Sequence, residues 1–385
     1  MKTQTSKTER LPKKLGEPNI VHLLLGLPSP QMMSGINVVV HHLAQAMYHL
    51  GYSTSVWSLN DHTHPEYLPE YPLEIFIRKK NRFQAPDGLA KAIQELSNSS
   101  IVHIHNLYTP EVRWIARQLH KRNIPYVLTP HGCLSTRNLK KNFWLKYPYI
   151  TLFDNEILRK AKSLQALGEI EGAQMTKWNA QVKIIPNAFD PSELKPAYLP
   201  EDTAQLRFCF VGRITMFIKG LDLLFAGFEK YRSEGGTGKL RLIGGGHDDA
   251  RLKKMVEDSE VAPFVEILGP KYGDEKMDLI SESQVFVLTS RTEGLPMSVL
   301  EAAAIEKSLL VSKETNMGPH VDEFKAGIVL PENTGDCIAE AMHQFEQAFH
   351  QGTLQETAVN AKKMITQSLN WPNVAQRIAD EIYLA

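Results

Sequence analysis

At 385 residues, the chain is longer than the roughly 250–300 residues that one hydrophobic core usually serves, so we expect two domains. Lys plus Arg and Asp plus Glu number 43 each, and this balance argues against a nucleic-acid-binding protein, which usually carries a clear basic excess. The three cysteines lie far apart and form no Cys-x-x-Cys pair, which argues against a disulfide framework and against a structural zinc site.

The start of the chain, residues 1–18, is polar and predicts a flexible N-terminal tail. It lacks the apolar stretch of a signal peptide, and no apolar run in the sequence approaches the ~18 residues of a membrane span. Unpaired cysteines also suit a reducing compartment. These features together predict a cytoplasmic protein.

Apolar runs typical of buried parallel strands alternate with helix-periodic segments over residues 19–187. The predicted strands are Ile20–Leu27, Ser53–Leu59, Leu73–Ile77, Ile101–His105, Tyr126–Thr129, Ser163–Ala166 and Val182–Ile185. The predicted helices between them include Val38–Leu50, Leu89–Leu96 and Glu111–Lys121. This order predicts a parallel sheet with helices on both faces.

A stretch with three prolines, residues 188–205, interrupts the alternation and predicts a linker. The alternation resumes over residues 206–370, with strands predicted at Leu206–Val211, Lys239–Ile243, Phe264–Leu268, Val285–Thr289, Leu309–Ser312 and Gly327–Leu330. The predicted helices include Leu221–Tyr231, Ala250–Asp258, Glu275–Glu282, Met297–Glu306 and Asp336–Phe349. We expect residues 371–385 to form a C-terminal helix that packs back on the N-terminal domain. The predicted fold class is α/β, with two doubly wound Rossmann-like domains facing a central cleft.

Basic side chains follow the first predicted strand of the second domain. Arg213 lies just after that strand, and Lys219 follows six residues later. Ligands of doubly wound sheets bind outside the carboxyl ends of the strands. The planar guanidinium group of Arg213 and the mobile ammonium group of Lys219 could therefore converge on a diphosphate. A solvated surface loop is the alternative, because exposed Lys and Arg are common.

A second cluster follows a later strand of the same domain. Glu293, Gly294 and Leu295 lead into a predicted helix, and the free N–H groups at a helix start can bind an anion. Carboxylates accept hydrogen bonds from hydroxyls, so Glu293 could hold a sugar and Glu301 a ribose. Alternatively, Glu293 interacts only with the helix dipole, and Glu301 lies on a solvated face. The small apolar residues around Glu301 favour a partner for its carboxylate.

Taken in order, these motifs resemble the donor site of family 4 retaining glycosyltransferases (glycosyl transferases group 1), which have the GT-B fold. The matching segments in the second domain are Phe210-Val-Gly-Arg213, Lys219-Gly220, Ile243-Gly-Gly-Gly246 and Glu293-x7-Glu301. Those in the first domain are Ser34-Gly35-Ile36, the strand Ile101–His105 with its His-x-His end, Thr129-Pro-His-Gly132 and Ile185-Pro-Asn-Ala188. The chain departs from the family pattern where Gly35 stands alone instead of in a pair and where Ala188 replaces a glycine.

The resemblance implies a retaining, hexosyltransferase-like enzyme (EC 2.4) that takes a sugar from a nucleotide-diphosphate sugar, with UDP preferred over GDP. The implied donor-binding residues are Gly35, Arg213, Lys219, Glu293, Gly294, Leu295 and Glu301, and the implied catalytic residues are His131, Arg213, Lys219 and Glu293. Arg213 and Lys219 would neutralise the diphosphate, and His131 would contact the donor sugar. Because side chains would carry that charge, we expect no metal and no other cofactor.

Many members of this family build lipopolysaccharide, exopolysaccharide or glycolipids, so the resemblance implies a glycan or a lipid-linked acceptor. Residues 137–162 combine basic and aromatic side chains and could contact the inner face of the cytoplasmic membrane. The alternative is an amphipathic helix that packs its aromatic side chains on the domain, with its lysines in solvent.

Three other classes of protein remain as alternatives. A dinucleotide-dependent oxidoreductase would carry Gly-x-Gly-x-x-Gly after the first strand, where this chain has only Gly26 and Gly35. A non-catalytic nucleotide-sugar-binding protein would keep the two cations but would not need Glu293 or His131. A nucleotide-sugar epimerase of the same fold would lack the ordered donor-site set.

Overall fold

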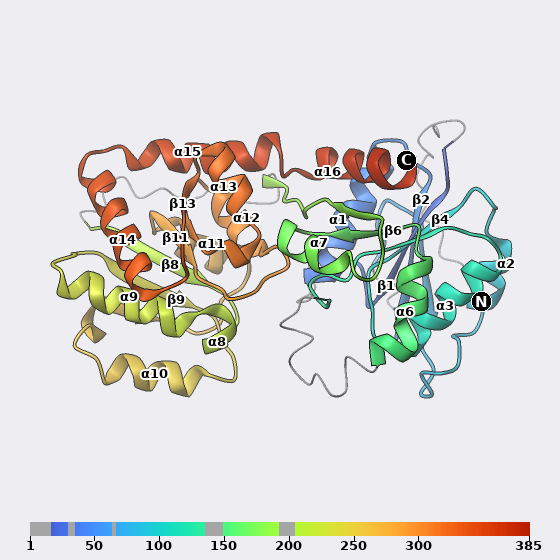
Figure 1. Cartoon of the computed structure of the whole chain (residues 1–385), viewed down its shortest axis with the longest axis horizontal. Coiled ribbons are helices and arrows are strands. Elements are labelled where there is room, and N and C mark those ends of the chain that lie inside the picture. Colours follow the sequence, from blue (N-terminus) through green and yellow to red (C-terminus); the bar gives the residue numbers. More distant parts are fainter. Residues whose placement is uncertain (1–16, 30–34, 64–66, 135–148, 192–204) are drawn as a thin grey trace. The chain divides into compact units, whose positions relative to one another are not determined.

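The computed structural model describes residues 17–29, 35–63, 67–134, 149–191 and 205–385. The chain divides into two compact units (Figure 1). The first contains Met1–Asn187 together with Trp371–Ala385, and the second contains Ala188–Asn370.

The first unit contains a seven-stranded parallel sheet in the order β3-β2-β1-β4-β5-β6-β7. Its strands are β1 (Ile20–Leu25), β2 (Thr54–Asn60), β3 (Leu73–Ile77), β4 (Ile101–Ile104), β5 (Tyr126–Leu128), β6 (Ser163–Ala166) and β7 (Val182–Ile184). Its helices are α1 (Gly35–His49), α2 (Leu89–Glu95), α3 (Pro110–Lys121), α6 (Asn155–Lys160), α7 (Glu169–Met175) and α16 (Trp371–Ile378), with π-helical turns at Ile150–Asp154 and Ala379–Tyr383.

Helices cover both faces of this sheet, because successive strand side chains point to opposite sides. Leu23 of β1 packs in one core with Ile115 of α3, whereas Leu24 packs in another with Val40 of α1. The C-terminal helix α16 packs against α1 (Figure 1). The end of the chain is therefore part of the first unit.

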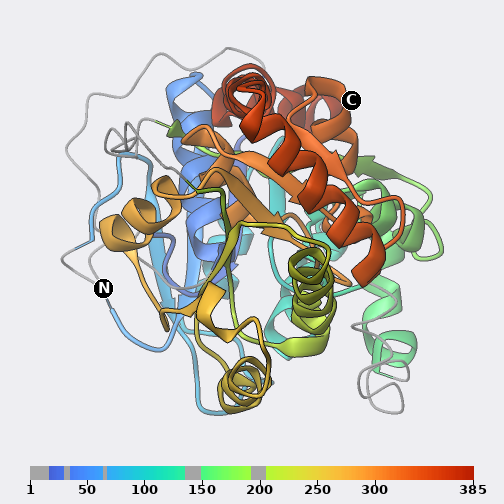
Figure 2. The same cartoon turned by 90° about the vertical axis from the view of Figure 1, so that its left-hand side faces the viewer.

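The second unit contains a six-stranded parallel sheet in the order β10-β9-β8-β11-β12-β13. Its strands are β8 (Arg207–Val211), β9 (Lys239–Ile243), β10 (Val265–Ile267), β11 (Val285–Leu288), β12 (Ser308–Val311) and β13 (Gly327–Val329). Its helices are α8 (Met216–Lys219), α9 (Leu221–Ser233), α10 (Asp249–Glu257), α11 (Gly273–Ser281), α12 (Met297–Ala304), α13 (Gly318–Phe324), α14 (Gly335–His350) and α15 (Leu354–Gln367). Helix α9 packs against α14, and α12 packs against α15 (Figures 1 and 2).

Strand order reverses once in each sheet, between β1 and β4 in the first unit and between β8 and β11 in the second. At such a point the connections leave toward opposite faces, and the loops at the carboxyl ends of the two strands leave an opening between them. The fold therefore marks the loops after β8 and β11, and those after β1 and β4, as the places where a ligand would bind.

The predicted α/β class with two Rossmann-like domains is confirmed. Every predicted strand is present, and its ends differ from the prediction by two residues at most. Helix α1 begins at Gly35, three residues earlier than Val38, because Ile36 already packs on the same core as Val40. Gly35 is therefore the first residue of the helix. Among the described residues, no helix is long and apolar enough to cross a membrane.

Candidate active site

The loop that follows β8 presents two cations at the carboxyl edge of the second sheet. Arg213 lies two residues after the end of the strand and is exposed. Among the residues that the structure describes, its guanidinium group has no hydrogen-bond or ion-pair partner. Lys219 is the last residue of the short helix α8. Both predicted phosphate-binding side chains thus lie beside the reversal of strand order.

Two glycines allow the neighbouring loops to approach this one closely. A Cβ on Gly220 would lie 2.0 Å from the carbonyl oxygen of Thr289, and Gly220 has the left-handed φ of +64° that favours glycine. A Cβ on Gly244, whose φ is +152°, would lie 1.8 Å from the carbonyl oxygen of Gly212. The loops after β8, β9 and β11 therefore touch through their backbones.

Lys219 and Glu293 form an ion pair, with 2.6 Å between Nζ and Oε1. The hydroxyl of Ser290 donates a second hydrogen bond, 2.6 Å long, to the same carboxylate oxygen. The side-chain amide of Asn316 donates to the carbonyl oxygens of Glu293 and Gly294, at 2.9 and 2.8 Å. Lys219 and Glu293 were predicted as separate site residues, and the structure brings them together.

Helix α12 carries Glu301, which also has a cationic partner. Glu301 pairs with Lys276 of α11, with 2.6 Å between Oε2 and Nζ, and both side chains are mostly buried. Leu295, just before the helix, is buried, and Pro296 occupies the N-cap position. The predicted buried partner of Glu301 is thus present. Lys276 itself was not predicted, because no motif connects it to α12.

Arg291 joins the two loops, and it was not predicted either. Its guanidinium group donates to both carboxylate oxygens of Asp222, at 2.7 Å each, and to the carbonyl oxygen of Phe217 at 2.9 Å. It also lies over the exposed Phe217 ring, 4.4 Å from the centroid. The backbone N–H of Arg291 donates to the carbonyl oxygen of Ile218. The sequence did offer one signal for Arg291, since this residue directly follows Thr289-Ser290 at the carboxyl end of β11.

The first unit holds the other two predicted site residues, Gly35 and His131. His131 follows β5, has a φ of +49° and is partly exposed. The buried Glu171 of α7 accepts hydrogen bonds from the backbone N–H groups of Gly132 (2.6 Å) and Leu167 (2.9 Å), which fixes the turn that carries His131. Burial lowers the pKa of His131 to about 4, so its imidazole is neutral at pH 7.

A buried histidine of β1 and another directly after β4 lie behind His131. Nδ1 of His22 is 3.0 Å from Nε2 of His105, and Nδ1 of His105 is 3.4 Å from Nε2 of His131. Burial lowers the pKa of His22 to about 3 and places the pKa of His105 well below its usual value. All three rings are therefore neutral at pH 7.

His103 belongs to a separate hydrogen-bond chain. Its Nδ1 is 2.6 Å from the hydroxyl of Tyr383, and its Nε2 is 2.6 Å from the hydroxyl of Thr129. Thr129 donates to Gln165, whose amide donates to the carbonyl oxygen of Ile185. The carbonyl of Ile185 can only accept, so the amide nitrogen of Gln165 faces it and the amide oxygen accepts from the hydroxyl of Thr129. The oxygen of Thr129 therefore accepts from Nε2–H of His103, which leaves Nδ1 of His103 to accept from the hydroxyl of Tyr383.

His22, His103 and His105 lie close enough to share a metal ion, with nitrogen atoms within 4.8 Å of one another. Both nitrogens of His103 and the facing nitrogens of His22 and His105 already have hydrogen-bond partners, however. A metal would have to displace those bonds. The arrangement therefore fits a hydrogen-bonded cluster better than a metal centre.

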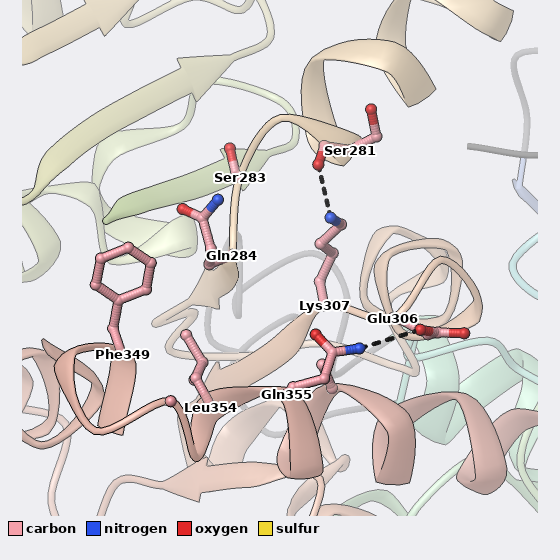
Figure 3. A pocket seen from close by; sticks show the side chains of 10 residues that line it. Ser281, Ser283, Gln284, Glu306, Lys307, Phe349, Leu354 and Gln355 are labelled. Carbon is pink, nitrogen blue, oxygen red and sulfur yellow. Dashed lines mark hydrogen bonds between the residues drawn. The ribbon is translucent and has the colours of Figure 1, made fainter. Parts of the chain in front are cut away.

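A pocket of about 310 Å³ lies elsewhere in the second unit (Figure 3). Its wall includes residues just before β11 and β12, at the amino ends of those strands, opposite the edge that carries Lys219. Inside it, the buried Lys307 donates to the carbonyl oxygen of Ser281 at 2.6 Å, and burial lowers the pKa of Lys307 to about 8. The pocket is thus separate from the candidate site.

Comparison with known proteins gives matches over nearly the whole chain. Residues 33–193 match the model of glycosyltransferase family 4, and residues 192–364 match the model of glycosyl transferases group 1. A putative colanic acid biosynthesis glycosyltransferase, WcaL of Salmonella typhimurium, is 24% identical over 167 residues, which are 42% of this chain and 41% of that protein. The chain matches between about a third and about half of the length of the first curated relatives.

Solved structures share the fold at low sequence identity. Sucrose-phosphate synthase from Thermosynechococcus elongatus has a TM-score of 0.73 and 17% identity, with 94% of this chain and 98% of that chain covered. HepE of Anabaena, solved in complex with UDP and glucose, has a TM-score of 0.69 and 16% identity, with 95% and 99% covered. The fold is therefore GT-B, and the chain belongs to the glycosyltransferases of group 1 and family 4.

Proposed function

We propose that this chain transfers a sugar from a nucleotide-diphosphate sugar to a carbohydrate acceptor, with retention at the transferred carbon. One observation carries the proposal. The Lys219–Glu293 pair lies where the strand order of the second sheet reverses, which is where ligands of doubly wound folds bind. A cation for a diphosphate and a carboxylate for sugar hydroxyls are thus adjacent.

Arg213 and Lys219 would neutralise the diphosphate leaving group, together with the N–H groups near Gly294 and Leu295 at the start of α12. Arg213 suits this role because its side chain is exposed at the strand end. The charge that develops on the leaving phosphate would meet fixed cations, and such electrostatic stabilisation supplies most of the rate enhancement in many enzymes. In this proposal neither a metal nor another cofactor takes part.

Glu293 would accept hydrogen bonds from the donor sugar, and Glu301 from the ribose. In the first unit, His131 would contact the donor sugar, and Gly35 at the start of α1 would approach the phosphates. UDP is the proposed nucleotide, in preference to GDP. The structure of HepE in complex with UDP and glucose supports UDP as a nucleotide that this fold can hold.

The proposed acceptor is a glycan or a lipid-linked glycan in the synthesis of cell-surface polysaccharide or glycolipid, at the cytoplasmic side of the membrane. The name of WcaL, a putative glycosyltransferase of colanic acid biosynthesis, supports this class. Part of the proposed membrane contact, residues 137–148, lies outside the described residues. In the described part, Leu152 and Phe153 are exposed, at 73% and 45%.

Some side chains of this segment make contacts within the first unit. The guanidinium group of Arg113 lies 4.8 Å from the centroid of Phe153, and Lys160 pairs with Glu156. The segment 149–162 therefore uses part of its aromatic and basic groups within the domain, and Leu152 is the side chain best placed to enter a bilayer surface.

A two-step experiment tests the proposed function. The full chain is first screened by thermal shift against UDP- and GDP-sugars, because a ligand that binds only the folded state raises Tm. The stabilising donor is then incubated with glycan and lipid-linked acceptors, and products are identified by mass spectrometry. Transfer supports the proposal. Binding without transfer would indicate a non-catalytic binding protein, and conversion of the donor sugar without an acceptor would indicate an epimerase.

A further inference from the structure

The three histidines His22, His105 and His131 form a line from the interior of the first sheet to its carboxyl edge. His22 lies on β1, His105 directly follows β4, and His131 follows β5. His22 and His105 are fully buried, whereas His131 is partly exposed. The ring centroids of His22 and His105 are 5.3 Å apart, and those of His105 and His131 are 5.6 Å apart.

The middle ring couples the two ends. Nε2 of His105 faces His22, and Nδ1 of His105 faces His131. A neutral imidazole has one N–H donor and one acceptor nitrogen. His105 must therefore donate to one neighbour and accept from the other, so the tautomer of His131 follows from that of His22.

His22, at the buried end of the line, fixes the direction of the hydrogen bonds. Nε2 of His22 is buried and has no hydrogen-bond partner among the described residues. If the proton of His22 were on Nε2, a buried N–H group would lack an acceptor, and such orphaned donors are rarer in proteins than orphaned acceptors. The proton therefore belongs on Nδ1, where His22 donates to His105.

The rest of the line follows from this choice. His105 accepts at Nε2 and donates from Nδ1, and His131 accepts at Nε2, which leaves its single proton on Nδ1. Among the described residues, Nδ1 of His131 has no hydrogen-bond partner. His103 does not interfere, since both its nitrogens are engaged in the separate chain through Tyr383 and Thr129.

We propose that His22, His105 and His131 form a directional hydrogen-bond relay that makes Nδ1 of His131 a hydrogen-bond donor. His105 and His22 are positioning residues, and they act through His131. The consequence of the relay for substrate binding rests on the proposed function. In that function, the Nδ1–H group of His131 donates a hydrogen bond to an oxygen atom of the nucleotide sugar, such as a sugar hydroxyl. A turn fixed by Glu171 holds that N–H in place.

Nitrogen-15 NMR of the full chain labelled at histidine tests the relay without any ligand. Long-range correlations between ring protons and nitrogens show which nitrogen carries the proton. We expect His22, His105 and His131 each to be protonated on Nδ1 at pH 7.5, with assignments from His131→Ala and His22→Asn. Protonation of His131 or His22 on Nε2 would overturn the proposal.

Two variants of His105 then separate the relay from simple packing. In His105→Asn, the side-chain amide can replace Nδ1 as the donor to His131, so His131 keeps its tautomer and kcat falls less than about 3-fold. In His105→Leu no donor remains, so His131 populates both tautomers, and kcat falls by about 10- to 100-fold, approaching the effect of losing an oriented donor. Equal tautomer ratios and equal kcat in the two variants would refute the relay.

A third variant supplies the control. His41→Leu removes another buried histidine of the first unit, which is hydrogen-bonded to Tyr71 and Tyr67 and not to the relay. It should leave the tautomer of His131 unchanged. A wild-type chain that shows the expected tautomers but transfers no sugar would contradict the proposed function and still support the relay.

Discussion

Lys219 and Glu293, 74 residues apart in sequence, hold each other at 2.6 Å across two loops at the carboxyl edge of the second sheet. Each side chain is largely buried, at 17% and 15% exposure. A buried charge is costly without a partner, so each fixes the other before any donor arrives. The proposed diphosphate-binding cation and the proposed sugar-binding carboxylate are thus preorganised as one unit.

This pairing predicts that Lys219→Ala damages the site in two ways. The variant loses a cation for the leaving group, and among the described residues the carboxylate of Glu293 then keeps the hydroxyl of Ser290 as its hydrogen-bond donor. We expect kcat to fall by at least about 100-fold, as when one preorganised electrostatic contact is removed. Steady-state transfer assays and calorimetric titration with UDP measure the effect.

Lys230→Ala is the matched control for Lys219→Ala, since Lys230 forms an ion pair of the same length with Asp336 on the surface of the same unit. Exposed pairs of this kind contribute about 0–1 kcal/mol, so this variant should keep full activity. Arg213→Ala should behave like Lys219→Ala. Full activity in either of the two site variants would contradict the diphosphate assignment.

The contacts of Arg291 with Asp222 and Phe217 lead to a second prediction, which concerns the position of the loop that carries Lys219. Lysine cannot reproduce the two-pronged bond to Asp222 and also reach the carbonyl oxygen of Phe217. We expect Arg291→Lys to raise KM for the donor several-fold and to lower the stability of the second unit by about 1 kcal/mol, or about 2–4 °C in Tm.

Arg377→Lys is the control for this change, because Arg377 forms an exposed pair with Glu381 in the first unit. Its donor KM should equal that of the wild type. If Arg291→Lys lowered Tm without changing KM, Arg291 would stabilise the fold without positioning the site.

The proposed charge neutralisation by side chains predicts activity without a divalent metal. We expect the initial transfer rate to be unchanged after treatment with excess EDTA, because Arg213, Lys219 and the N–H groups of α12 would supply the positive charge. Rates are compared with and without EDTA and after addition of Mg²⁺ or Mn²⁺. Activity that EDTA abolishes and Mg²⁺ restores would disprove the metal-free mechanism.

The strands could be predicted because their signal is local. Buried parallel strands such as β8 and β11 are continuous apolar runs, and all their core residues are buried in the structure. Helix α15 was not predicted. Its buried residues include Ala358 and Ala361, whose small side chains give a weak apolar periodicity among many polar neighbours.

The residues of the candidate site could be named from the sequence, but the pairs that they form could not. Arg213, Lys219, Glu293 and Glu301 stand in motifs after strands, so their sequence context points to a ligand. The pair of Lys276 with Glu301 becomes visible only when α11 and α12 are placed in space. The bond between Arg291 and Asp222 becomes visible only when β8 and β11 lie side by side, which depends on strand order. Local sequence carries no information about that order.

The buried histidines predict a loss of stability at mildly acidic pH. The pKa of His22 is about 3 in the folded chain because of burial, against about 6.5 in the unfolded chain. Above pH 6.5 His22 is neutral in both the folded and the unfolded chain, and its contribution to the free energy of unfolding is fully present. As the pH falls below 6.5, the unfolded chain binds a proton that the folded chain does not bind, so the free energy of unfolding decreases.

Comparison with His22→Asn isolates this contribution, because the other titrating groups are common to both chains. The wild type should lose about 2 kcal/mol of stability relative to His22→Asn between pH 6.5 and pH 5. Urea unfolding at a series of pH values measures the difference. His62→Asn removes an exposed histidine and should follow the wild-type curve. Parallel curves for the wild type and His22→Asn would show that His22 is not held neutral by burial.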